Sequence, residues 1–100
     1  MIVNAAIQVV PLADIDKALP VIDRAIAIIQ QSGIKYTVGA FETLLEGEYE
    51  QVQALIKRVQ DFCYAQQEIQ FLVYSKLHFC GGSHILADTK TAKFNPAKGL

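Results

Sequence analysis

The sequence predicts an α+β fold in which two helices cover one face of a four-stranded antiparallel sheet. Segments of alternating or continuous apolar residues, typical of strands, are interspersed with two segments of helical period. Along the chain these segments follow the order strand, helix, strand, strand, helix, strand. The length of 100 residues suits one domain rather than two.

The first strand is predicted at residues 2–10, and Pro11 is expected to end it. Because side chains alternate along a strand, the even positions share a mixed face on which Gln8 is a polar group. A helix follows, with either Asp14 or Asp16 as its N-terminal cap, and runs to about Ser32, where Gly33 is expected to stop it.

The apolar residues of this first helix follow the spacing of one buried stripe. They are Leu19, Ile22, Ala25, Ile26 and Ile29. Val21 and Ile28 widen the stripe, which indicates contact with a second helix as well as with a sheet.

The second half of the chain begins with a predicted hairpin of strands at residues 34–38 and 41–46, joined at Gly39 and Ala40. Helical period returns from Glu48 to about Gln66, and a long strand is predicted at residues 69–79. The inward-facing residues of this helix are expected to be Val52, Leu55, Ile56, Val59, Phe62 and Cys63.

The order βαββαβ leaves few topologies once crossovers are right-handed, and the commonest is the ferredoxin-like sandwich. Residues 1–80 are therefore predicted to form a single ferredoxin-like domain. Residues 81–100 are polar and weakly patterned. They are expected to be a C-terminal tail, or a short element that docks on a neighbouring subunit.

Composition narrows the classes of function. A net charge of −1 argues against a nucleic-acid-binding surface, which needs a basic excess. No apolar stretch approaches the length of a membrane span, and no basic region follows Met1 as in a signal peptide. Cys63 and Cys80 do not make a disulfide framework. We expect a cytoplasmic protein with reduced thiols.

The sheet face away from the helices is expected to be half apolar. Ala6, Val10, Leu72 and Tyr74 would lie there among polar residues. With 52% hydrophobic residues in so short a chain, this face predicts a cover, either a second copy of the sheet or a flat ligand.

The stretch FETLLEGEYE contains several carboxylates whose roles differ. Glu48 and Glu50 are expected in the first turn of the second helix, where they offset its dipole. Glu46 is either a solvated strand end or a site residue at the sheet rim. The faces of the strand at 41–46 stay open, and with them the role of Glu42.

Four segments together resemble a small family of thiamine-binding, ferredoxin-like domains. They are IQVVPL, SGIKYTVG, GAFETLLEG and VYSKLHF, and the resemblance spans about residues 2–78. Members of that family bind thiamine or its pyrimidine fragment without known chemistry on it, as dimers or tetramers formed through their sheets. The resemblance implies the ligand-binding candidates Gln8, Tyr36, Thr37, Thr43 and Glu46.

The expected function is thus a non-catalytic small-molecule binding protein for thiamine or a pyrimidine precursor, acting as a homodimer or homotetramer. A carboxylate suits the cationic thiazolium. Lys76 is expected to be an exposed strand lysine, to pair with Glu46 or Glu42, or to meet the phosphate of a phosphorylated ligand. The alternatives are a regulatory module for another metabolite and a purely structural assembly domain.

Neither catalysis nor a metal is predicted. His78, Cys80 and His84 match no common zinc spacing, and no fourth ligand is evident. Nothing in the sequence places a base beside a nucleophile, so we expect no enzyme activity, no metal site and no cofactor.

Overall fold

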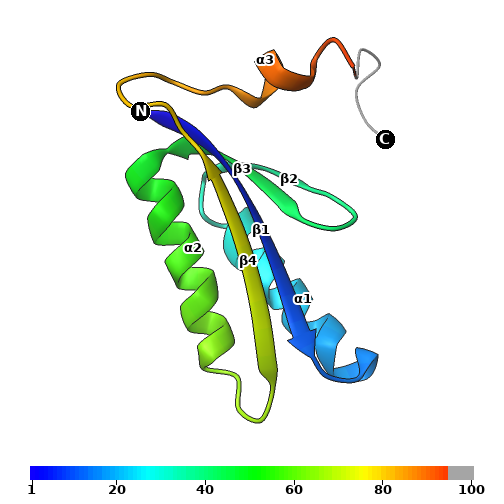
Figure 1. Ribbon diagram of the computed structural model, residues 1–100. Helices are drawn as coiled ribbons and strands as arrows, with labels where there is room; N and C mark the ends of the chain where they lie inside the picture. Colours follow the sequence, from blue (N-terminus) through cyan, green and yellow to red (C-terminus); the bar gives the residue numbers. More distant parts are fainter. Residues whose placement is uncertain (95–100) are drawn as a thin grey trace.

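The predicted α+β fold is confirmed in the computed structural model, which describes residues 1–94 (Figure 1). Both long helices lie on one face of an antiparallel sheet with the strand order β2-β3-β1-β4. The elements are β1 (Ile2–Leu12), α1 (Ile15–Gln30), β2 (Lys35–Val38), β3 (Thr43–Glu48), α2 (Tyr49–Tyr64), β4 (Gln70–His78) and α3 (Ala87–Thr91).

The core lies between the sheet and the two long helices. β1 contributes Val3, Ala5 and Ile7, and Leu45 lies beside them on β3. The inward face predicted for α2 is confirmed: it buries Val52, Leu55, Ile56, Val59 and Cys63, and Phe62 is partly buried against the cluster. Each large apolar side chain removed from water contributes roughly 1.5–3 kcal/mol.

The buried face predicted for α1 is confirmed only in part, since Ala25, Ile29 and Val21 are buried as expected. Its buried residues are Ala18, Val21, Ala25 and Ile29. Of the predicted stripe, Leu19 is exposed, and Ile22 and Ile26 are only partly buried. The helix carries two adjacent apolar stripes, and its period alone does not tell which one is buried in the core.

β1 continues past Pro11 to Leu12, so the prediction that this proline ends the strand was wrong. β1 pairs with β3 only from Ile2 to Ile7 but with β4 from Asn4 to Leu12. Within residues 1–94, its last residues therefore have no strand on the β3 side. Pro11 is tolerated because its missing N–H would point to that unpaired side.

β3 begins and ends two residues later than predicted. The Gly39 N–H donates to the Glu42 carbonyl at 3.0 Å, which closes the connection from β2. Glu48 is consequently the last strand residue rather than part of the α2 first turn, and its carboxylate lies 2.8 Å from the N-terminal ammonium. Glu50 does lie in the first turn of α2.

The open faces of β3 and β4 are now assigned. Leu45 and Thr43 are buried on the helix face, so Glu42, Leu44 and Glu46 belong to the opposite side. Opposite Gln8 and Val10 lie Tyr74 and Leu72 of β4. The mixed, half-apolar character predicted for this face is confirmed.

The segment after β4 crosses the end of the sheet where β1 begins and forms the short α3 (Figure 1). This segment packs on β1 of the same chain through two hydrogen bonds. The Ile85 N–H donates to the Ile2 carbonyl, and the Ile2 N–H donates to His84 Nδ1, both at 2.8 Å. The remainder of the expected tail, residues 95–100, lies outside the described residues. No helix within residues 1–94 is long and apolar enough to cross a membrane.

Candidate functional site

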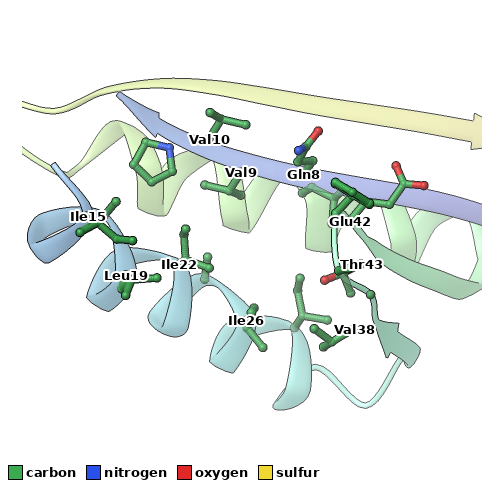
Figure 2. A pocket seen from close by; sticks show the side chains of 18 of the residues that line it. Gln8, Val9, Val10, Ile15, Leu19, Ile22, Ile26, Val38, Glu42 and Thr43 are labelled. Carbon is green, nitrogen blue, oxygen red and sulfur yellow. The ribbon is translucent and has the colours of Figure 1, made fainter. Parts of the chain in front are cut away.

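A pocket of about 480 Å³ lies between α1 and the part of β1 that β3 does not reach (Figure 2). It exists because β1 is longer than β3, so the sheet is only two strands wide beneath the first turns of α1. The loop from Val38 to Thr43 bounds its other end.

The helix wall of the pocket is apolar. It contains Ile15, Leu19, Ile22 and Ile26, the second stripe of α1, together with the buried residues Ala18, Ala25 and Ile29. Figure 2 shows α1 across the gap from β1, with Ile22 directed toward the strand and Val9 turned toward the helix. The apolar side chains of α1 and of β1 thus form two walls with space between them, which suits a flat, weakly polar molecule.

The strand wall of the pocket is the edge of β1. Five consecutive residues, Ile7 to Pro11, line it. Because successive side chains point to opposite faces of a sheet, such a run indicates that the main chain itself borders the pocket.

The polar rim of the pocket consists of Gln8, Glu42 and Thr43. The Thr43 side chain is buried, whereas Gln8 and Glu42 point away from α1, toward the open face of the sheet (Figure 2). Glu42 Oε1 lies 3.2 Å from the exposed Lys76 Nζ. Of the residues 1–94 that line the pocket, Glu42 is the one that is ionisable.

Glu46 lies outside the pocket and holds the C-terminal segment. Its Oε1 accepts from the Ala87 N–H at 2.6 Å and from Asn4 Nδ2 at 3.2 Å, and Lys35 Nζ lies 3.3 Å from its Oε2. The Ala87 N–H, aided by Lys35 and Asn4 and opposed by burial, lowers the pKa of Glu46. This carboxylate is therefore ionised, and groups of the same chain already bind both of its oxygens.

The five residues implied by the resemblance are divided by the structure. Gln8 and Thr43 line the pocket. Tyr36 pairs with Leu45 on the helix side of β2, and Thr37 pairs with Leu44 on the open side. Tyr36, Thr37 and Glu46 are not among the residues that line the pocket.

Sequence reasoning missed the apolar wall and left Glu42 unassigned. The signal for the wall was present in α1, whose apolar residues exceed what one buried stripe needs. Glu42 could not be placed, because the register of β3 decides which way its side chain points.

The histidines and cysteines do not converge. His78 Nδ1 lies 2.8 Å from Lys90 Nζ, and His84 Nδ1 is bonded to the main chain of β1. Within the described part of the chain, no group of three or more His, Cys, Asp or Glu side chains is arranged to hold a metal ion. Cys63 is buried, and burial raises the pKa of its thiol.

Comparisons with known proteins match the whole domain. The solved domain of unknown function DUF77 from Bacillus cereus is 34% identical, with a TM-score of 0.85 over 99% of this chain and 95% of that one. A Thermotoga maritima protein with the provisional name of thiamine biosynthesis/salvage protein is 29% identical, with a TM-score of 0.81 over 94% and 99% of the two chains.

Sequence comparison agrees with the structural one. The UPF0045 protein of Clostridium perfringens is 25% identical over 91 residues, which are 91% of this chain and 95% of that protein. The sequence profile of the family described as thiamine-binding protein matches residues 5–93. The chain thus belongs to the thiamine-binding protein family.

Proposed function

We propose that this protein binds thiamine, or its hydroxymethylpyrimidine half, in the pocket between α1 and β1 and releases it chemically unchanged. The observation that carries the proposal is this pocket, in a chain of the thiamine-binding protein family. Its volume of about 480 Å³ lies within the range of small-molecule sites. The provisional name of the Thermotoga maritima relative supports the same ligand class.

The lining suits the two halves of thiamine. The aromatic pyrimidine would lie between the apolar wall of α1 and β1, where its burial contributes in proportion to the apolar area removed from water. The thiazolium carries a positive charge and would lie at the rim, near the Glu42 carboxylate. Gln8 and Thr43 offer neutral hydrogen-bonding groups that fix orientation.

We propose a carrier or sensor rather than an enzyme. Catalysis on the ligand would need an activated nucleophile or an acid/base pair at the site. Among the described residues that line the pocket, Glu42 is the single ionisable group, and no thiol or imidazole accompanies it. The pocket composition thus favours binding alone.

We further propose that the protein works in the cytoplasm as a homodimer or homotetramer. Leu44, Leu72 and Tyr74 on the open sheet face are 46%, 44% and 55% exposed, and a second sheet would cover them. Two free cysteines, one of them exposed, suit a reducing compartment.

The open sheet face is the alternative place for the ligand, since Thr37 and Glu46 lie there. The pocket is favoured because Glu46 already accepts hydrogen bonds from Asn4 and Ala87. A ligand amino group at Glu46 would have to compete with these hydrogen bonds, whereas a ligand in the pocket leaves them intact.

Calorimetric titration with thiamine and with the free pyrimidine alcohol tests the proposal. The wild type should bind both, and Ile22→Gln should weaken binding at least tenfold by placing an amide in the apolar wall. The matched control is Tyr64→Gln, which changes an exposed aromatic on α2. Absence of heat with both ligands would contradict the proposal and leave a regulatory module for another metabolite, or a structural assembly domain.

A further inference from the structure

The edge of β1 that borders the pocket has a defined hydrogen-bonding pattern. In an antiparallel sheet, the N–H and C=O of one residue point to the same neighbouring strand, and successive residues alternate between the two neighbours. β1 keeps an unbroken register with both partners, from Ile2↔Glu48 to Ile7↔Thr43 and from Asn4↔His78 to Leu12↔Gln70. No bulge resets the alternation between these limits.

Two hydrogen bonds fix which residues point to which side. The Tyr49 N–H donates to the Met1 carbonyl at 3.1 Å, on the β3 side. The Ile85 N–H donates to the Ile2 carbonyl on the opposite side, where β4 pairs further along. Odd-numbered residues of β1 therefore direct their main-chain groups toward β3, and even-numbered residues direct theirs toward β4.

Val9 is an odd-numbered residue beyond the reach of β3. β3 begins at Thr43, which pairs with Ile7, so within residues 1–94 no strand faces Val9 on that side. The Val9 N–H and C=O thus point from the strand edge toward the space that residues Ile7 to Pro11 border. They form an adjacent donor and acceptor at the wall of the pocket.

We propose that this main-chain pair of Val9 reads the aminopyrimidine edge of the ligand, an inference that rests on the proposed function. The edge of a 4-aminopyrimidine presents a ring nitrogen acceptor beside an amino donor. The Val9 N–H donates to the ring nitrogen, and the Val9 carbonyl accepts from the amino group. The two parallel bonds specify the amino-substituted ring without any charged side chain.

Pro11 supports the assignment to a small ligand. It is the next residue that points to this side, and it has no N–H to donate. The unpaired edge therefore offers a donor at Val9 but none at the following position, so an added strand would lose a ladder bond there. A ring that needs one donor and one acceptor meets no such defect.

The orientation of the ring follows from the surrounding side chains. With its polar edge on Val9, the pyrimidine would lie over the second stripe of α1, from which Ile22 and Ile26 line the pocket (Figure 2). The remaining half of the ligand would extend toward the rim at Glu42. The Val9 end of the site would thus recognise the aminopyrimidine edge, and the Glu42 end would face the positive charge of the thiazolium.

The ligand arm of the test compares thiamine with the analogue in which the 4′-amino group is replaced by oxo. That change inverts the donor and acceptor along the edge, and we expect at least a thirtyfold loss of affinity in calorimetric titration, as expected for two mismatched hydrogen bonds. Equal affinities for the two compounds would overturn the inference while leaving the proposed function intact. No binding of thiamine itself would instead overturn the proposed function.

The protein arm uses Val9→Pro, which removes the N–H that faces the pocket but no bond of the β1–β4 ladder. We expect a tenfold or greater loss of thiamine affinity. Val9→Ala is the matched control, because it shortens the side chain and keeps the N–H. Its loss should be clearly smaller, and equal losses in the two variants would overturn the inference. Circular dichroism establishes that both variants fold.

A third measurement uses the wild type and does not depend on either variant folding. In amide hydrogen exchange resolved by NMR, thiamine should slow exchange at Val9 at least tenfold, because the ligand accepts from that N–H. Unchanged exchange at Val9 in the saturated protein would overturn the inference.

Discussion

Glu42 and Lys76 form a 3.2 Å ion pair that spans β1 on the open face of the sheet, at the rim of the proposed site. The pair is solvent-accessible, since 73% of the lysine side chain and 35% of the glutamate side chain are exposed. Such pairs contribute about 1 kcal/mol or less. A cationic ligand can therefore displace the lysine from Glu42 at little cost.

Lys76→Gln should strengthen the binding of thiamine about two- to fivefold, because Glu42 would then face the thiazolium without a competing cation. The neutral pyrimidine alcohol lacks this charge and should bind the variant and the wild type alike. Calorimetry at low and moderate salt checks both expectations. A gain of the same size for the neutral ligand would contradict the assigned role of Glu42.

Glu46→Ala should destabilise the fold rather than remove a ligand contact. The substitution leaves the Ala87 N–H and Asn4 Nδ2 without their acceptor. We expect the free energy of unfolding to fall by about 1–3 kcal/mol in urea denaturation. If stability is unchanged and thiamine binding is lost, the ligand lies on the open face instead of in the pocket.

The lowered pKa of Glu46 should make the stability of the fold depend on pH. The pKa of Glu46 lies below its ordinary value of 4.5 in the folded protein, so ionised Glu46 stabilises the fold above that value. This contribution is lost as the pH falls through the folded-state pKa. The free energy of unfolding of the wild type should therefore fall more steeply than that of Glu46→Gln between about pH 5 and pH 3.

Glu46→Gln isolates this effect, because the variant retains Glu48, whose own pKa is lowered by the N-terminal ammonium. Parallel stability curves for the two proteins would show that Glu46 contributes nothing to the pH dependence.

Tyr74→Glu should weaken self-association. Tyr74 lies on the open face opposite Gln8, where a second sheet is proposed to pack, and a carboxylate there would be buried without a partner. Sedimentation velocity should detect a shift toward monomer at equal concentration. An unchanged oligomer would contradict the proposal that the open sheet face forms the interface.

The sequence predicted the fold because each element carries a local signal. α2 has a single apolar stripe, so its buried residues Val52, Leu55 and Val59 followed from the helical period. The order of strands and helices then left few topologies. Local pattern and global fold agree in this part of the molecule.

The site was predictable only in part, because it depends on relations between elements. Gln8 and Thr43 line the pocket, but its strand wall exists because β3 starts too late to pair with Val9. No local pattern specifies that difference in length. Similarly, the partners of Glu46 include Ala87, a residue of a segment with weak patterning, so its role in binding the C-terminal segment was not visible.

The central claim is that the ligand occupies the pocket between α1 and β1. Methyl NMR on protein labelled at isoleucine and leucine measures this most directly, through intermolecular NOEs from the pyrimidine methyl group of bound thiamine. Thiamine bound in the pocket should give NOEs to the methyls of Ile22 and Ile26 and none to Leu44 or Leu72 on the open face. NOEs to Leu44 and Leu72 without any to the α1 isoleucines would contradict this claim.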